Sequence, residues 1–129
     1  MMNRILLTIM FWVAAVAGAF ASDGGPHIEF AEKTHDFGTI HESNGRVSTS
    51  FEFTNTGDKP LVIVTAYASC GCTKPKYPEA PIAPGQKGEI SVTYNPANRR
   101  GEFSSTVTVT TNDKKNKKIK LKLTGVIVP

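Results

Sequence analysis

Two cysteines separated by one glycine are the residues of this sequence best suited to chemistry. Cys70, Gly71 and Cys72 stand between Ser69 and Thr73. In an extended backbone residues i and i+2 point the same way, with Cβ atoms roughly 7 Å apart, whereas a disulfide needs about 3.8 Å. A Cys70–Cys72 bond therefore requires a bend, which Gly71 permits because glycine adopts positive φ values. We expect such a small, exposed ring to be strained and easily reduced.

Four interpretations of this pair stay open. A local disulfide that tightens a loop suits an oxidising compartment. Zinc needs four ligands, so a metal site would have to combine Cys70 and Cys72 with histidines. The alternative metal set is therefore Cys70, Cys72 and His35, with His27 and His41 as further candidate ligands. Thiol–disulfide exchange usually relies on C-x-x-C rather than C-x-C spacing. The fourth interpretation is a pair of buried or intermolecularly bonded thiols. We expect no metal and no other cofactor.

No other pattern predicts catalysis or binding to a nucleic acid. His35 and Asp36 are neighbours, but neighbours on a strand face opposite sides, so the pair indicates a structural turn with Phe37 in the core. The lysines of residues 114–118 are typical of a solvated hairpin tip, followed by Lys120 and Lys122 pointing outward. We therefore expect no enzyme and no nucleic-acid partner.

The first 21 residues have the pattern of a secretory signal peptide. Arg4 precedes an uncharged apolar run, which ends in small residues up to Ala21, and the helix-breaking residues 22–26 follow. Cleavage after Ala21 removes every methionine, the only tryptophan and one positive charge, so the net charge of +4 falls to +3. We expect one domain over residues 22–129, located in the periplasm or outside the cell, with no stable membrane insertion after cleavage.

Period-two alternation of apolar residues dominates the chain after residue 22. Phe51 and Phe53 alternate with polar residues, for example, and an Asn-Thr-Gly turn follows them. The apolar, β-branched run 61–67 is typical of a strand that is covered on both sides or lies centrally. Many short strands with regular turns predict an all-β fold, an antiparallel β-sandwich of immunoglobulin-like type with about seven strands. These strands are residues 28–30, 37–40, 46–54, 61–67, 90–94, 103–109 and 119–128.

The longest irregular segment covers residues 69–88 and contains four prolines. Proline lacks the N–H of a sheet ladder and fixes φ, so this segment predicts a stiff surface connection rather than a strand. Such connections often carry the binding surface of a sandwich. We expect an interaction loop here with Ser69, Thr73, Lys74 and Tyr77 as its contact residues.

Six motifs occur in order from about residue 33 to residue 125. They are residues 35–38 (HDFG), 51–57 (FEFTNTG), 69–73 (SCGCT), 81–85 (PIAPG) with Gly88, 90–96 (ISVTYNP) and 121–125 (LKLTG). In these motifs the chain resembles the bacterial family known as domain of unknown function 1573, DUF1573. The resemblance implies an immunoglobulin-like sandwich, akin to domains of Hydin-like and pilus-chaperone-like proteins, in exported proteins. It implies no activity.

Two functions are therefore expected. The first is an exported, non-catalytic binding module of the bacterial cell envelope. Its partner would be another envelope protein or a peptide segment, bound by the loop 70–88 or by an exposed sheet edge. The second is a thiol-dependent function, either metal binding or redox exchange, centred on Cys70 and Cys72.

Overall fold

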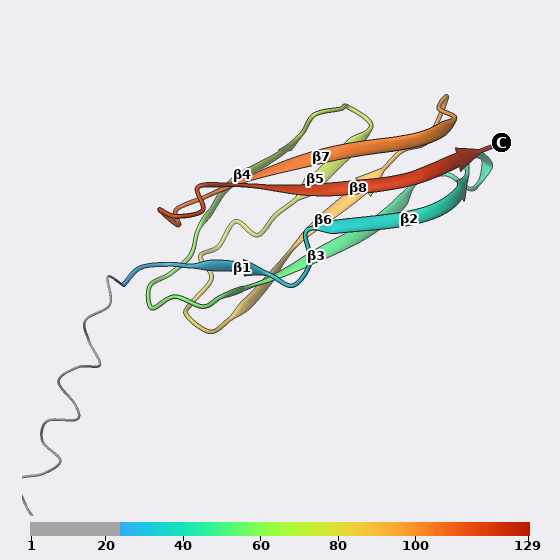
Figure 1. Cartoon of the computed structure of the whole chain (residues 1–129). Coiled ribbons are helices and arrows are strands. Elements are labelled where there is room, and N and C mark those ends of the chain that lie inside the picture. Colours follow the sequence, from blue (N-terminus) through green and yellow to red (C-terminus); the bar gives the residue numbers. More distant parts are fainter. Residues whose placement is uncertain (1–23) are drawn as a thin grey trace, which may run out of the picture.

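Two four-stranded sheets pack face to face in the computed structural model, which describes residues 24–129 (Figure 1). The signal-peptide prediction for residues 1–21 lies outside the described part. No helix within residues 24–129 has the length and apolar character needed to cross a membrane. The sandwich itself confirms the expected all-β class.

The first sheet is antiparallel throughout. Its strands follow the spatial order β1 (Ile28–Phe30), β3 (Val47–Asn55), β6 (Lys87–Tyr94) and β5 (Thr73–Lys76). The pairing of β3 with β6 extends over eight residues, from Val47 opposite Tyr94 to Thr54 opposite Lys87. The short strands β1 and β5 form the two edges.

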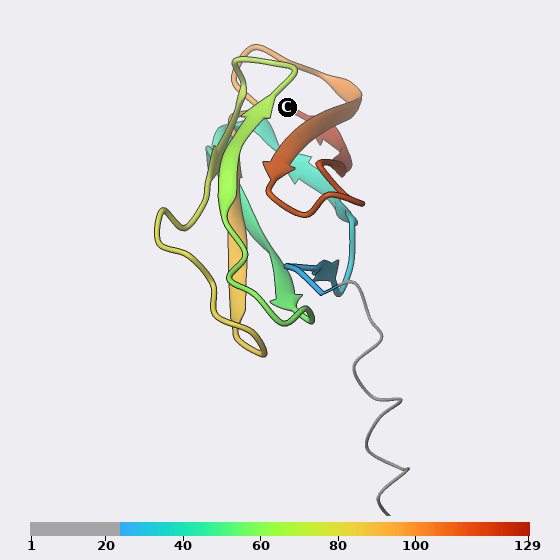
Figure 2. The same cartoon turned by 90° about the vertical axis from the view of Figure 1, so that its left-hand side faces the viewer.

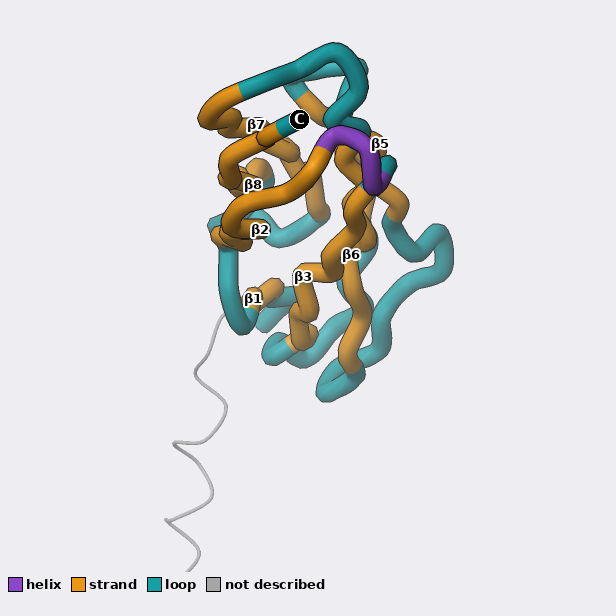
Figure 3. Tube along the Cα trace, turned by 90° about the vertical axis from the view of Figure 1, so that its right-hand side faces the viewer, coloured by secondary structure: helices purple, strands orange, loops and turns teal. Residues whose placement is uncertain are grey.

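The second sheet contains one parallel pair. Its order is β2 (Thr34–His41), β8 (Lys118–Val128), β7 (Gly101–Thr111) and β4 (Ile63–Ala68). The strands β2 and β8 run parallel, with a shift of register between Asp36 and Thr39. The prediction of a purely antiparallel sandwich is therefore wrong for this pair. A short 3-10 turn, η3 (Glu42–Asn44, purple in Figure 3), links β2 to β3 at the end where the C-terminus lies.

The core lies between the sheets and confirms the predicted alternation. Phe51, Val92 and Leu121 point inward and are buried, while Lys120 and Lys122 on β8 point outward. The ring of Tyr94 stacks on that of Phe103, with centroids 4.2 Å apart. These contacts join the two sheets at one end of the sandwich.

Two strand predictions need correction. The segment 69–88 was expected to contain no strand, but it includes β5, whose Pro75 pairs with Val92. Proline is tolerated there because β5 is an edge strand and needs ladder hydrogen bonds on one side only. With β5 the strands within residues 24–129 number eight rather than about seven. The run 61–67, expected to be covered or central, forms the edge strand β4.

Two buried polar side chains fasten the first residues of the described chain. The Asp113 carboxylate accepts a 3.0 Å hydrogen bond from the backbone N–H of Ile28 and contacts His27 Nδ1 at 3.2 Å. The Asn55 side chain accepts a 3.3 Å hydrogen bond from the backbone N–H of His27 and donates to the carbonyls of Lys59 and Ile82. Each group satisfies backbone atoms that the ladders leave unpaired, which buried polar groups require.

Candidate functional site

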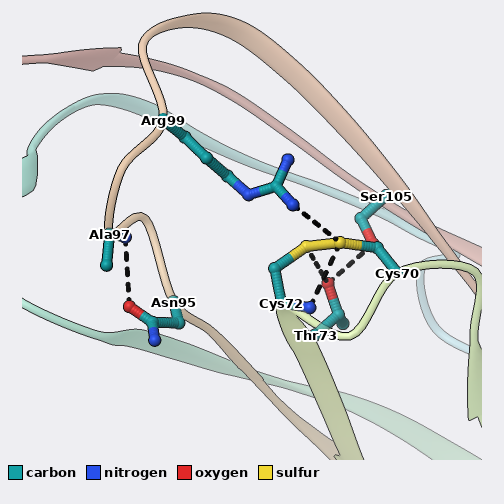
Figure 4. The surroundings of a disulfide bond; sticks show 7 residues. All are labelled: Cys70, Cys72, Thr73, Asn95, Ala97, Arg99 and Ser105. Carbon is teal, nitrogen blue, oxygen red and sulfur yellow. Dashed lines mark hydrogen bonds between the residues drawn. A yellow bond between two sulfur atoms is a disulfide. The ribbon is translucent and has the colours of Figure 1, made fainter.

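A disulfide joins Cys70 to Cys72 in the turn between β4 and β5 (Figure 4). The Cα atoms of the two residues are 5.2 Å apart, so the backbone bends between them as expected. Gly71 does not adopt the positive φ that the sequence suggested for this bend. Both cysteines are half-buried rather than enclosed. This arrangement corresponds to the first of the four interpretations of the pair, the local disulfide.

Backbone hydrogen bonds hold the same turn on both sides of the disulfide. The N–H of Thr73 donates to the carbonyl of Cys70 at 3.1 Å, and the N–H of Asn95 donates to the carbonyl of Cys72 at 2.8 Å. The Thr73 hydroxyl bonds to that of Ser105 at 2.7 Å. Thr73 is only 4% exposed. It therefore positions the turn from inside the sandwich and is not the surface contact residue that the sequence predicted.

The sulfur of Cys70 has two hydrogen-bond donors. The backbone N–H of Cys72 lies 3.1 Å from it, and Nη2 of Arg99 lies 3.4 Å from it. The sulfur of Cys72 has a weaker contact, 3.7 Å to the Thr73 hydroxyl. Figure 4 shows the Arg99 side chain reaching from the β6–β7 loop toward the disulfide. The two sulfurs therefore stand in different electrostatic surroundings.

Hydrogen bonds within the loop of residues 95–100 fix the backbone that carries Arg99. The N–H of Ala97 donates to the Asn95 side chain, and the N–H of Arg99 donates to the carbonyl of Pro96. Asn98 adopts a φ of 63°, a conformation that asparagine tolerates better than most residues. Burial raises the pKa of the nearby Tyr94 hydroxyl, and the positive charge of Arg99 partly offsets that rise.

A pocket of about 170 Å³ adjoins the disulfide. Its lining includes Cys72 and two cationic side chains, Arg46 and Lys74. Within residues 24–129 neither of these cations forms an ion pair, since the two pairs there are His27–Asp113 and Lys87–Glu52. The pocket therefore offers positive charge beside the half-buried Cys72. It is completed by Gly71, Thr93 and Asn95.

The other predicted loop residues lie near the disulfide but differ in accessibility. Ser69 is exposed, and its N–H donates to the carbonyl of Thr106 on β7. Lys74 is exposed on the edge strand β5. Tyr77 is half-buried and packs against the core. The structure thus leaves Ser69 and Lys74 as the accessible members of the predicted interaction loop.

The alternative metal set is not assembled. His35 lies on β2, where its ring packs edge-on against Phe37 with centroids 4.6 Å apart. No group of three His, Cys, Asp or Glu side chains with metal-binding geometry occurs in the described range 24–129. Asp36 accepts a hydrogen bond from the N–H of Gly38, but His35 and Asp36 lie within β2 and pair with Leu123 and Thr124 of β8, so the predicted turn is wrong. Phe37 is partly buried and packs against the core.

A second surface feature, which sequence reasoning missed, lies on β4. Val64 is 55% exposed and Tyr67 50%, and both belong to this edge strand. The only other large apolar side chain exposed in the described part of the chain is Val126, on β8. Figure 2 shows β4 (light green) at the front of the molecule; β7 is its one partner within its sheet, and β5 of the other sheet lies close to it. The apolar, uncharged composition of residues 61–67 was the available signal.

The comparison with protein families identifies this chain. Residues 28–127 match the model of a family described as "Protein of unknown function (DUF1573)". The chain belongs to that family, which confirms the resemblance. No match was found among curated proteins.

Solved structures with the same architecture confirm the immunoglobulin-like sandwich. A protein of unknown function from Porphyromonas gingivalis W83 superposes with a TM-score of 0.71 at 14% identity. That alignment covers 84% of this chain and 50% of the other, so the chain spans half the length of that protein. The ASH/PapD-like domain 7 of human CEP192 gives a TM-score of 0.58 at 15% identity, and the alignment covers 78% of this chain and 84% of that domain. The YadV chaperone gives a TM-score of 0.57 at 14% identity, and the alignment covers 79% of this chain and 52% of that chain. At these identities the likeness shows the fold alone.

Proposed function

We propose that this protein is an exported, non-catalytic interaction module of the bacterial cell envelope that binds an extended segment of another protein along β4. The observation that carries the proposal is the exposure of Val64 and Tyr67 on an uncharged edge strand. An added strand would gain main-chain hydrogen bonds from the free edge and side-chain contacts from these two residues.

The other three edge strands carry features that discourage pairing, and β4 has fewer of them. The strand β1 has only three residues, and β5 has four, including Pro75 between two lysines. The strand β2 bears Asp36 and a break in register. Short length, charge, proline and bulges all protect edges against added strands. The sequence of β4, IVTAYA, has neither charge nor proline. Beyond the backbone bridge that pairs Leu61 with Ile82 just before this strand, β4 is the edge with the fewest such features.

The one irregularity in β4 turns a side chain outward. The register shifts between Ile63 and Thr65, which leaves Val64 without a partner residue on β7. Bulges commonly re-aim a side chain in this way. Tyr67, opposite Thr108, adds an aromatic ring, the kind of residue that dominates binding energy in interfaces. We infer a partner segment with apolar or aromatic side chains at alternate positions.

Export is part of the same proposal. The apolar segment that ends at Ala21 supports cleavage by a signal peptidase. The Cys70–Cys72 disulfide supports an oxidising compartment. The intact mass of protein purified from the envelope of the producing bacterium tests this step: we expect a chain that begins at Ser22. Full-length protein recovered from the cytoplasm would contradict export.

Site-specific photo-crosslinking tests the binding edge. A benzophenone amino acid is placed at Ser69, just beyond β4, and the cross-linked protein and peptide are identified by mass spectrometry. We expect one predominant partner, cross-linked through a segment of alternating apolar residues. Val64→Lys with Tyr67→Lys should abolish this product, because charges on the edge oppose an added strand.

Val126→Lys is the matched control. It also replaces an exposed valine by lysine, but on β8, which has strands on both sides. We expect it to preserve the cross-link. Equal loss in both variants, or a cross-link to a second copy of this chain through its own β4, would overturn the proposed heterologous partner.

A further inference from the structure

We propose that the Cys70–Cys72 disulfide is a reversible redox site, which takes two electrons from a dithiol of an acidic partner protein and releases the Cys70 sulfur first. The protein is a stoichiometric reactant in this exchange. The inference does not depend on strand binding at β4, because it rests on different residues: Arg99, the disulfide and the cationic pocket.

The first argument is that the fold has little need of this bond. The disulfide closes a loop of three residues, and the stabilisation from a cross-link grows with the length of the loop that it closes. The turn is already held by the hydrogen bonds from Thr73 N–H to Cys70 and from Asn95 N–H to Cys72. None of these bonds involves sulfur. The turn can therefore keep its shape when the disulfide is reduced.

The second argument is the difference between the two sulfurs. When a disulfide is cleaved, one sulfur leaves as a thiolate, and the better stabilised thiolate leaves faster. A negative charge on Cys70 would be stabilised by the Arg99 guanidinium at 3.4 Å and by the Cys72 N–H at 3.1 Å. The hydrogen-bond contact of Cys72 Sγ is a hydroxyl at 3.7 Å; Arg46 and Lys74 line the pocket beside Cys72, but neither forms a hydrogen bond to its sulfur. The geometry therefore favours attack on Cys72 and departure of Cys70.

The exchange balances in two steps. A partner thiolate attacks Cys72 Sγ and forms a mixed disulfide, while the Cys70–Cys72 bond breaks and its electron pair stays on Cys70 Sγ beside Arg99. The second thiol of the partner, as a thiolate, then attacks the partner sulfur of the mixed disulfide. That step forms the partner disulfide and releases Cys72 as a thiolate. The partner dithiol is oxidised, and its two protons end on Cys70 and Cys72 through solvent.

The third argument is the charge beside Cys72. The pocket of about 170 Å³ places Arg46 and Lys74 next to this residue. Two cations without an acidic partner within residues 24–129 attract an attacking thiolate and carboxylates near it. A partner whose cysteines are flanked by Asp or Glu fits this surface, and one flanked by Lys or Arg does not.

Reduction of the purified protein by small thiols tests the charge argument. Glutathione carries carboxylates, cysteamine carries an ammonium group, and the rate with each is followed at low ionic strength from free-thiol labelling. We expect faster reduction by glutathione relative to thiolate concentration. Arg46→Gln with Lys74→Gln should reduce this preference by about tenfold, which corresponds to about 1.4 kcal/mol.

A charge-matched control separates the pocket from the net charge of the protein. Lys114→Gln with Lys115→Gln removes the same charge from the exposed β7–β8 hairpin. That hairpin adjoins the start of β4 through the bond from Val62 N–H to Asn112, whereas the disulfide follows the end of β4. We expect this variant to retain the preference. Equal loss in both double variants would overturn the role of the pocket.

The position of the trapped mixed disulfide tests the role of Arg99. The glutathione reaction is quenched with an alkylating agent, and peptides are mapped by mass spectrometry. We expect glutathione on Cys72 and the alkyl group on Cys70. Arg99→Gln should slow reduction by about tenfold and spread the adduct over both cysteines, while Arg100→Gln should leave both results unchanged. An adduct mainly on Cys70, or a disulfide that resists excess glutathione, overturns the proposal.

Discussion

The hydroxyl groups of Thr73 and Ser105 bond to each other at 2.7 Å although the two residues lie in different sheets. Thr73 begins β5, and Ser105 lies in the middle of β7. Both are buried, Ser105 with only 2% of its surface exposed. Each hydroxyl is therefore the polar partner that the other needs inside an apolar core.

A double-mutant cycle on this pair should show strong coupling. Thr73→Val or Ser105→Ala alone leaves one buried hydroxyl without its partner, which costs about 1–3 kcal/mol of the free energy of unfolding. The double variant should lose less than the sum of the single losses, because it leaves no unpaired hydroxyl. Urea unfolding of the four proteins measures the coupling. Additive losses would mean that the bond does not form in solution.

Asp113 should make stability depend on acid pH. Burial alone would raise the pKa of this carboxyl, but hydrogen bonds from Asn116, from the N–H of Ile28 and from the N–H of Lys115, together with the charge of His27, lower it below its ordinary value of 3.8. A lowered folded-state pKa contributes stability that is present above the unfolded value and is lost as the pH falls through the folded value.

Replacing Asp113 by asparagine should therefore act in two ways. At pH 7 we expect a loss of about 2 kcal/mol in the free energy of unfolding, because charge-assisted hydrogen bonds to a buried group are lost. Between pH 5 and the acid limit the variant should lose less further stability than the wild type. Urea unfolding at several pH values measures both effects. Glu79→Gln, at an exposed site, is the control and should change neither.

Reduction of the disulfide should cost little stability. Loop-entropy arguments give about 1.6 kcal/mol for a loop of three residues, compared with about 3 kcal/mol for a loop of fifteen. The free energy of unfolding, measured in urea with and without a dithiol reductant, should differ by no more than about 2 kcal/mol. Complete unfolding on reduction would show that the bond is a structural requirement, contrary to the redox proposal.

Tyr94 should ionise late in an alkaline titration. Burial raises the pKa of its hydroxyl, and the charge of Arg99 offsets only part of that rise. A raised folded-state pKa contributes stability below the unfolded value of 10.0, which is lost as the pH rises through the folded value. Absorbance of the phenolate should therefore show a late component, which Tyr94→Phe removes. A titration unchanged by this substitution would contradict the burial of the hydroxyl.

The sequence was sufficient for most strands and for the direction of their side chains. Alternation in residues such as Phe51, Phe53 and Val92 reflects one buried face, and that pattern is local. The strand β5 was missed because Lys74, Pro75 and Lys76 show no apolar alternation. The parallel pairing of β2 with β8 was missed because the register of two strands about eighty residues apart leaves no signal in either segment alone.

The candidate site was only half predictable. The spacing of Cys70 and Cys72 made a local disulfide one of four open interpretations, since both partners lie in one short segment, and the structure has that disulfide. Arg99 lies 29 residues from Cys70 in sequence and reaches it only because the β6–β7 loop folds back over the β4–β5 turn. The exposed face of β4 was misread because an apolar, β-branched run has the same composition at the centre of a sheet as at an edge.

The position of β8 has a consequence for how the molecule is made. This strand, Lys118–Val128, lies between β2 and β7 and, in the part of the chain that the structure describes, is the one sheet partner of β2. A ribosome synthesises the chain from the N-terminus, so β2 is made long before β8. Until β8 has been made, the second sheet lacks the strand that joins β2 to β7. We therefore expect this sheet to close only after nearly all of the chain has been synthesised, which is compatible with threading through a narrow pore before folding.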